Sequence, residues 1–309
     1  MSLSHCVELA SRVKPPWRNA LTLLELIVSL GILAVLSTVA VRSLDPIADQ
    51  SRYEATQRVL EELRNATIGD ATSRQNNGQR LIEGYVADTG SLPSDLDDFL
   101  TVPVGISSHS IQSFDSNNDA VDDVQLSSGW RGPYVQLGAG QTSILDGWGR
   151  ELLVVPGVGT LDFTSNGSDG NSSLPEDGYA ADLTVTISDS EYTSDATLRL
   201  FDIDGTTSTR IDPAPTGLEQ LGVLLYCVNG DGGTSGAIEE VMIPVASSGT
   251  FEATKTDIVH GPAAARGILW SDTDSDDVFD VGESIIRSSY VHYFTITSDS
   301  DVRIEMELR

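Results

Sequence analysis

A single carboxylate, Glu25, interrupts an otherwise uncharged and mostly apolar run from Leu21 to Val41. At ~1.5 Å rise per residue, a helix over this run would be roughly 30 Å long, about the thickness of a bilayer's hydrocarbon core. A carboxylate in such a segment is costly and normally needs a partner. The sequence therefore predicts a transmembrane helix over 21–44 and marks Glu25 as its functional residue.

The segment before this run, residues 1–20, has three basic side chains against one acidic side chain and ends in Ala20. A basic stretch before an apolar one retains the N-terminus in the cytoplasm. A secretory signal has its small cleavage residue after a shorter apolar core, whereas here the small residue precedes the core. Cleavage after Ala20 would leave Leu21 as the new N-terminus. An ordinary signal anchor with an incidental glutamate is the alternative.

This arrangement resembles the class III signal of type IV pilins and type II secretion pseudopilins. In that family a prepilin peptidase cuts just before an apolar helix, and a glutamate is the fifth residue of the mature chain. The resemblance implies processing between Ala20 and Leu21, methylation of the new N-terminus, and a role for Glu25 in assembly. Ala20 stands where the family usually has Gly, and Leu21 where it has Phe or Met.

Four further blocks look like those of the major pseudopilin of type II secretion, in the same order. They are Gly90–Pro93, Gly129–Tyr134, Asp146–Arg150 and Asp162–Gly170. With the leader, the resemblance covers roughly residues 21–185. It implies an α+β, pilin-like fold in which a long N-terminal membrane helix packs on a small antiparallel sheet. The periplasmic part of that fold would occupy residues 45–185.

Local sequence patterns predict the remaining helices and strands. Asp45-Pro46 predicts a kink or short break, after which an amphipathic helix continues to about residue 70. A second short helix is expected over 80–87, and a further turn over 94–100 capped by Ser94. Short apolar runs between Gly, Ser, Asp and Pro predict strands. The candidate strands are Glu151–Val155, Leu183–Ile187, Ala196–Phe201, Leu218–Cys227, Glu240–Val245, Ile285–Tyr293 and Val302–Leu308. Residues 186–309 are therefore expected to form an acidic, β-rich and sandwich-like C-terminal domain.

The segment 272–283 has oxygen-bearing side chains at the spacing of an EF-hand loop. Such loops bind Ca²⁺ through positions 1, 3, 5, 9 and 12 and through the backbone carbonyl at position 7. The predicted ligands are Asp272, Asp274, Asp276, the carbonyl of Val278, Asp280 and a bidentate Glu283. Position 6 is Asp277 rather than the usual Gly, and the flanking residues read as strands. An acidic turn without metal is the alternative.

Two other stretches are weaker candidates for metal binding. The pseudopilin resemblance implies a Ca²⁺ site in the loop after the fourth block. The candidate ligands there are Ser165, Asp169, Asp177 and Asp182. The stretch Asp115–Asp123 has the early ligands of an EF-hand loop, but Leu126 at position 12 argues against a tight site.

Charge and composition exclude several functions. The 309 residues include 46 acidic and 18 basic ones, so the net charge is −28, which argues against binding nucleic acid or an anionic membrane surface. Cys6 lies in the leader and Cys227 is then alone, so the mature chain has no internal disulfide. The four histidines lack metal-ligand spacing, and neither a phosphate loop nor a nucleophile elbow is present. We therefore expect no enzymatic activity.

These observations predict a pseudopilin-type structural subunit that polymerises into the periplasmic filament of a type II secretion-like machine. The predicted location is the inner membrane, crossed once, with the C-terminal domains in the periplasm. The predicted partners are further pseudopilin copies, the prepilin peptidase and the inner-membrane secretion platform. The alternatives are a type IV pilus subunit and a membrane-tethered, calcium-dependent adhesion or carbohydrate-binding module. Both alternatives would share the N-terminal helix.

Overall fold

The computed structural model describes nine stretches of the chain. They are 22–70, 84–172, 178–202, 219–228, 236–245, 251–276, 279–280, 282–297 and 302–309, without the side chains of 39–45 and 202. The predicted processing residues Ala20 and Leu21 lie outside these stretches, as do Asp177 and Val278. Contacts divide the chain into two units, Met1–Gln50 and Ser51–Arg309, and each is described by itself.

Helix α1, Leu23–Ile68, is 46 residues long. It starts after Thr22, whose Oγ1 accepts a hydrogen bond from the Glu25 N–H at 3.3 Å. The helix assignment is continuous through Pro46, so the predicted break at that residue is wrong. The helix ends at Gly69, whose φ of 80° favours glycine and whose N–H donates to the Asn65 carbonyl at 2.8 Å.

The predicted membrane span is corrected by this structure. Among the described residues, no helix combines the length and the apolar character needed to cross a membrane. The part of α1 before Arg42 contains Glu25 and the hydroxyl side chains of Ser29, Ser37 and Thr38, which lower its apolar character. The prediction of single-pass anchoring in the inner membrane is therefore not supported.

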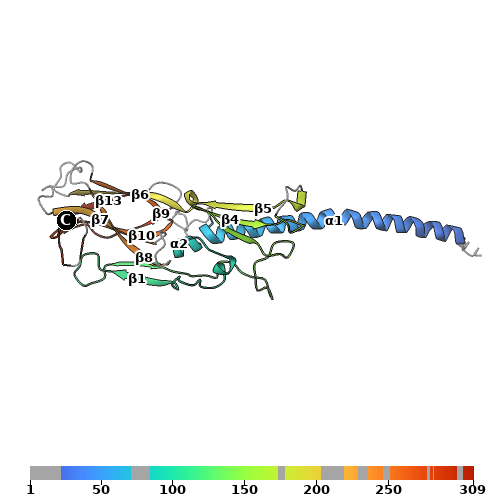
Figure 1. Ribbon diagram of the computed structural model, residues 1–309, viewed down its shortest axis with the longest axis horizontal. Coiled ribbons are helices and arrows are strands. Elements are labelled where there is room, and N and C mark those ends of the chain that lie inside the picture. Colours follow the sequence, from blue (N-terminus) through green and yellow to red (C-terminus); the bar gives the residue numbers. More distant parts are fainter. Residues whose placement is uncertain are drawn as a thin grey trace, which may run out of the picture. The chain divides into compact units, whose positions relative to one another are not determined.

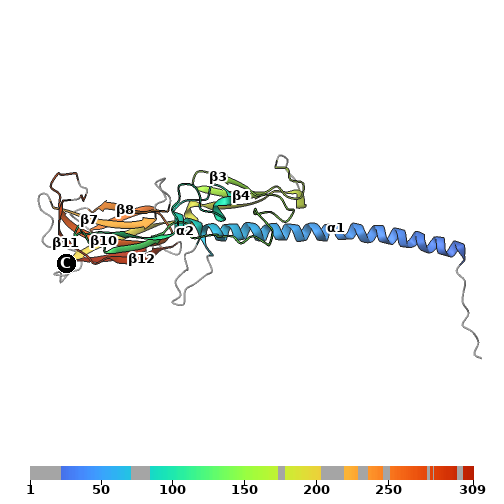
Figure 2. The ribbon, with the colours of Figure 1, turned by 90° about the horizontal axis from the view of Figure 1, so that it is seen from below.

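The first sheet of the second unit is antiparallel, with the strand order β3-β4-β5. Its strands are β3 (Leu153–Pro156), β4 (Thr160–Ser165) and β5 (Leu183–Ser188). Figures 1 and 2 show this sheet beside the second half of α1. Leu60 and Leu63 of the helix, Phe163 of β4 and Ile187 of β5 are at most 2% exposed and belong to one core. Two short helices, α2 (Tyr85–Thr89) and η1 (Leu96–Phe99), contribute Tyr85 and Phe99 to the same core.

The C-terminal part of this unit contains two larger sheets. One has the order β11-β10-β7-β8, with β12 also paired to β10, and the other has the order β13-β6-β9. Their strands are β6 (Thr193–Asp202), β7 (Glu219–Val228), β8 (Ile238–Pro244), β9 (Glu252–Val259), β10 (Gly261–Ser271), β11 (Ser284–Ser288), β12 (His292–Ile296) and β13 (Val302–Leu308). Strand β13 pairs with β6 in parallel, whereas the other pairings are antiparallel. The remaining short helices are η2 (Gly178–Ala180) and η3 (Asp189–Glu191).

Strand β7 is buried on both faces, which explains its nearly continuous apolar sequence. Leu221, Val223 and Leu225 face the core shared with β6, β9 and β13. Leu224 and Tyr226 face a second core that includes Val124 and Leu126. The latter two belong to β2 (Val124–Ser128), which forms a hairpin with β1 (Ser110–Phe114). The middle segment of the sequence thus covers the outer face of the central C-terminal sheet.

The predicted fold class is therefore wrong. The described chain has more strand than helix, with thirteen strands in four sheets, rather than a membrane helix on one small sheet with a separate domain after it. The expected strand over 285–293 is two strands, β11 and β12, because both pair with successive halves of β10. The expected turn near residue 94 is the helix η1, capped by Asp95 instead of Ser94.

Candidate metal centre and assembly helix

The loop 272–283 connects β10 to β11, two strands that pair with each other. The carboxylates of Asp272, Asp274 and Asp276 approach one another within 4.8 Å, so this group could hold a metal ion. Among the described aspartate, glutamate, histidine and cysteine side chains, it is the one group of three or more that does so. The sequence predicted these three residues together, and the structure brings them together on a β-hairpin.

Backbone geometry positions the first half of this loop. The Asp272 side chain is 1% exposed, and its Oδ1 accepts a hydrogen bond from the Ser275 N–H at 2.6 Å. Ser275 has a φ of 66°, which turns the chain sharply enough for Asp274 and Asp276 to face Asp272. Desolvation raises the pKa of Asp274, and the carboxylates of Asp276, Glu283 and Asp272 raise it further. The three carboxylates therefore repel one another, and a bound cation would relieve that repulsion.

Glu283 closes the loop from its far end. Its side chain is largely buried, and Oε1 accepts from the Thr273 N–H at 2.7 Å while Oε2 accepts from the Asp280 N–H at 3.1 Å. Each oxygen keeps a second lone pair, as the bidentate ligand at position 12 of such a loop needs. Phe279 packs edge-on against Trp270 of β10, with ring centroids 6.1 Å apart. The hairpin thus holds Glu283 in place with the aspartates, and an all-oxygen donor set suits a hard cation.

The loop 115–123 is organised differently, although its sequence is similar. Asp115 accepts backbone N–H groups from Asn117, Asp119 and Ala120, the last at 2.6 Å. The carboxylate of Asp123 forms an ion pair with Arg266 of β10 and accepts from the Ser116 N–H and hydroxyl. Its aspartates therefore bind the loop itself and a guanidinium.

The loop after β4, in which a second metal site was predicted, is described without residues 173–177, so the predicted ligand Asp177 is outside it. The guanidinium of Arg150 donates to the carbonyl oxygens of Gly167 and Ser168, so a cationic side chain binds two carbonyl oxygens of this loop. Ser165 is fully buried, and its hydroxyl donates to Asp146 at 2.8 Å. Asp169 lies at the exposed edge of the loop, where Oδ1 accepts from the Asn171 N–H at 3.0 Å. Asp182 is also exposed, and among the described carboxylates neither Asp169 nor Asp182 belongs to a group of three or more that could hold a metal ion.

Asp146 and Arg150 have roles that the sequence did not predict. Asp146 is 6% exposed and accepts from the backbone N–H groups of Trp148 and Arg150. Between them, a Cβ on Gly147 would lie 2.0 Å from the Arg52 carbonyl oxygen of α1, so this residue must be glycine. The block that resembles the pseudopilin motif is therefore a structural turn against α1.

A second motif block forms another buried polar network. Asp88 of α2 is 6% exposed, accepts two hydrogen bonds from Arg131, and accepts one from the Tyr134 hydroxyl at 2.8 Å. The Trp130 Nε1 donates to the Asp98 carbonyl at 2.8 Å. Burial raises the pKa of Tyr134. Trp130 and Tyr134 are partly buried and pack against the core of the first sheet, and the network fixes them on α2 and η1.

The first unit presents an apolar helix surface to its surroundings. Within Leu23–Leu36, which we call the apolar segment, the large hydrophobic side chains are 50–77% exposed. They are Leu23, Leu24, Leu26, Ile27, Val28, Leu30, Ile32, Leu33, Val35 and Leu36. Glu25 is exposed among them, three residues after the capping residue Thr22. Thr22 and Glu25 form the pattern T-x-x-E, a helix-capping signal that the sequence analysis did not use.

Glu25 therefore has a local function as well as any intermolecular one. A carboxylate in the first turn interacts favourably with the unpaired N–H groups at the start of a helix.

No protein-family model matches this chain, and a comparison with curated proteins gives no significant match. The family that the motifs indicate consequently rests on the residues themselves.

Proposed function

We propose that this protein is a structural subunit of a pseudopilin-type filament in a type II secretion-like machine. The observation that carries the proposal is the apolar segment, whose ten large side chains are each at least half exposed. A helix that is apolar on all sides is stable only when other apolar groups cover it. Copies of the same helix, packed side by side in a filament, provide such a cover. In this proposal the function of the chain is mechanical.

The motifs and the start of α1 support the same proposal. A prepilin peptidase would cut after Ala20, and the α-amine of Leu21 would become the N-terminus. The Glu25 carboxylate, exposed in the first turn of α1, would pair with that amine on a neighbouring copy. Because the contact is surrounded by apolar side chains, an unpaired carboxylate there would cost several kcal/mol. The pair would therefore set the register between neighbouring helices.

The test is a Glu25→Ala variant in cells that co-express a prepilin peptidase and the secretion components. We expect normal processing and folding but loss of incorporation into filaments, measured by shearing and electron microscopy. Glu62→Ala is the matched control, because it removes the same charge from an exposed position of the second half of α1. Normal incorporation of Glu25→Ala would refute the proposed role. Filaments displayed outside the cell, with no effect on secretion, would favour the type IV pilus alternative.

We also propose that the loop 272–283 binds Ca²⁺ and stabilises the C-terminal sheets. Its support is the convergence of Asp272, Asp274 and Asp276 within 4.8 Å. Oxygen ligands at EF-hand spacing favour Ca²⁺ over Mg²⁺, which requires a stricter octahedral geometry. Calorimetric titration should show one Ca²⁺ bound per chain, with binding lost in Asp274→Ala. Equal binding by the variant would place the ion elsewhere, and an absence of binding by the unaltered chain would refute the site.

A further inference from the structure

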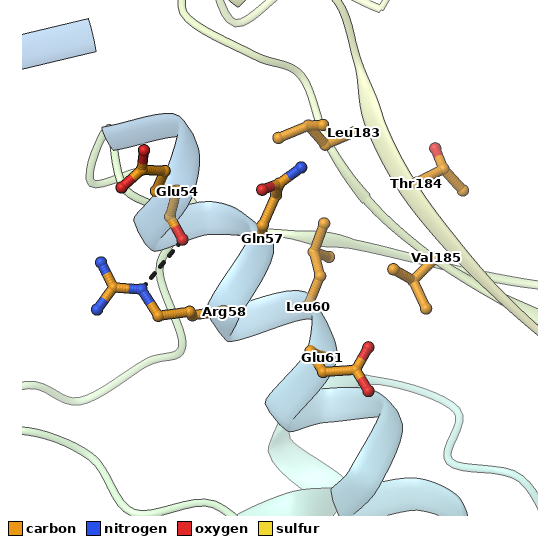
Figure 3. Close-up of a pocket in the computed structure, with 8 residues that line it drawn as sticks. All are labelled: Glu54, Gln57, Arg58, Leu60, Glu61, Leu183, Thr184 and Val185. Carbon is orange, nitrogen blue, oxygen red and sulfur yellow. Dashed lines mark hydrogen bonds between the residues drawn. The ribbon is translucent and has the colours of Figure 1, made fainter. Parts of the chain in front are cut away.

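Two surface features of the second unit are not used by the proposed function. One is a groove between α1 and β5, where the Arg58 guanidinium donates to the Glu54 carbonyl of its own helix at 3.2 Å (Figure 3). Charged, polar and apolar side chains all line this groove, so its lining favours no single class of occupant. The other feature is the loop 115–123, which contacts the loop 272–283 directly.

The contact between the two loops is made at the Asp280 carbonyl. This oxygen accepts the Asn118 side-chain amide at 3.3 Å and the Glu283 N–H at 3.1 Å. The Asp280 N–H in turn donates to Glu283 Oε2 at 3.1 Å. Asp280 and Glu283 are the predicted ligands at positions 9 and 12 of the metal loop. The Asn118 amide therefore binds the turn that joins two ligands.

The backbone of Asn118 is held in place by its own loop. Its φ of 55° lies in the left-handed region, which asparagine adopts more readily than most residues. The N–H groups on either side of it, those of Asn117 and Asp119, both donate to Asp115 Oδ1 at 3.2 Å. The position of Asn118 is therefore fixed without help from the loop 272–283.

The loop 115–123 is also anchored to the two strands that flank the loop 272–283. The Arg266 guanidinium of β10 pairs with Asp123 and donates to the Ser116 hydroxyl at 2.7 Å. The same guanidinium donates to the Ser288 hydroxyl of β11 at 3.0 Å. Because one loop is attached to β10 and β11 and the other joins these strands, the first can support the second from outside.

We propose that Asn118 is a positioning residue of the calcium site, acting through the Asp280 carbonyl. The inference rests on the proposed Ca²⁺ binding by the loop 272–283 and adds a residue outside that loop which raises its affinity. Groups that hydrogen-bond to metal ligands fix the orientation of those ligands, and their removal typically lowers metal affinity roughly 10- to 100-fold. The loop 115–123 thus contributes to the site through Asn118, with its own aspartates bound to its backbone and to Arg266.

The test compares the Ca²⁺ affinity of two glycine variants of the loop 115–123. Asn118→Gly removes the amide but keeps a residue that readily adopts a positive φ. Ala120→Gly is the matched control, because Ala120 also has a positive φ, 67°, and its methyl group cannot form a hydrogen bond. In calorimetric titrations of the full-length chain, we expect the dissociation constant for Ca²⁺ to rise about tenfold in Asn118→Gly and to stay unchanged in Ala120→Gly.

A second measurement separates this positioning role from a general loss of stability. A contact that strengthens Ca²⁺ binding must itself be strengthened by Ca²⁺ to the same extent. Ca²⁺ should therefore slow hydrogen exchange in the loop 115–123 of the unaltered chain and of Ala120→Gly, but not of Asn118→Gly. Without Ca²⁺, all three chains should melt at similar temperatures, because the lost contact is exposed.

The two measurements distinguish failure of this inference from failure of the calcium site. Equal dissociation constants for the unaltered chain and Asn118→Gly would overturn the role of Asn118 and leave Ca²⁺ binding by the loop 272–283 standing. A weaker affinity in Asn118→Gly that comes with a lower melting temperature without Ca²⁺ would also overturn it, because the amide would then stabilise the fold in general. An absence of Ca²⁺ binding by the unaltered chain would overturn both the inference and the calcium site.

Discussion

The loop after β4 and the loop after β10 are both rich in aspartate and glycine, but their oxygens face different groups. In the first, the Arg150 guanidinium donates to the carbonyls of Gly167 and Ser168. In the second, the carboxylates of Asp272, Asp274 and Asp276 face one another within 4.8 Å. One loop contains its cation as part of the covalent chain, whereas the other concentrates negative charge at a point where an external cation fits.

This difference separates two ways of stabilising an acidic loop. A guanidinium fixed by the chain is present at a constant effective concentration, so the loop after β4 should be independent of the ionic medium. Converging carboxylates stabilise a fold only when a cation reaches them, and the gain then grows with the free concentration of that cation. We therefore expect the Arg150 guanidinium to stabilise the region next to α1 at any cation concentration. We expect the stability of the C-terminal sheets to rise with the concentration of the cation that the carboxylates bind.

The largest expected effect is the loss of the internal cation. Arg150→Met should lower the free energy of unfolding by about 3 kcal/mol, because two hydrogen bonds from a charged donor are lost and two carbonyls lose their partner. Arg303→Met, which removes an exposed ion pair with Glu252, should cost less than about 1 kcal/mol. Denaturant unfolding of both variants measures the difference. Recovery of Arg150→Met by added Ca²⁺ would show that the two loops are not as distinct as their contacts indicate.

The next effect is the response of the C-terminal loop to metal. At a Ca²⁺ concentration 100 times the dissociation constant, the stabilisation should be about 2.7 kcal/mol, seen as a higher melting temperature. Asp274→Ala should remove this shift, and Arg150→Met should retain it in full. A shift of equal size in Asp274→Ala would mean that the ion stabilises some other part of the chain.

The sequence predicted that Asp272, Asp274 and Asp276 of the second loop act together, but it missed the Arg150 guanidinium that binds the first loop. EF-hand spacing is local, so Asp272, Asp274 and Asp276 can be read from a dozen consecutive residues. The contact from Arg150 to Gly167 joins residues 17 positions apart through a strand pairing, and no local pattern encodes it.

The difference between local and long-range information also explains which strands could be predicted. Strand β7 was predicted because its apolar run is nearly continuous, whereas its neighbour β10 was missed. The first half of β10 is Gly-Pro-Ala-Ala-Ala-Arg-Gly, whose residues are poor strand formers. It is nevertheless the central strand, pairing with β7 on one edge and with β11 and β12 on the other. Strand β10 is buried on both faces, where small residues fit. This burial outweighs the low intrinsic strand propensity of its residues.

The smallest predicted effect concerns the loop 115–123. Its sequence is similar to that of the loop 272–283, but its Asp123 binds an arginine, Arg266. Asp115→Asn replaces one acceptor oxygen by a donor and removes the bond from the Ala120 N–H, so it should cost about 1 kcal/mol. Because this carboxylate binds its own backbone, the calcium-induced shift in melting temperature should be the same as in the unaltered chain. Asp119→Asn, which alters a more exposed carboxylate of the same loop, is the control. A reduced calcium response in Asp115→Asn alone would show that Asp115 contributes to metal binding; the Asn118 amide, which donates to the Asp280 carbonyl at 3.3 Å, links the two loops.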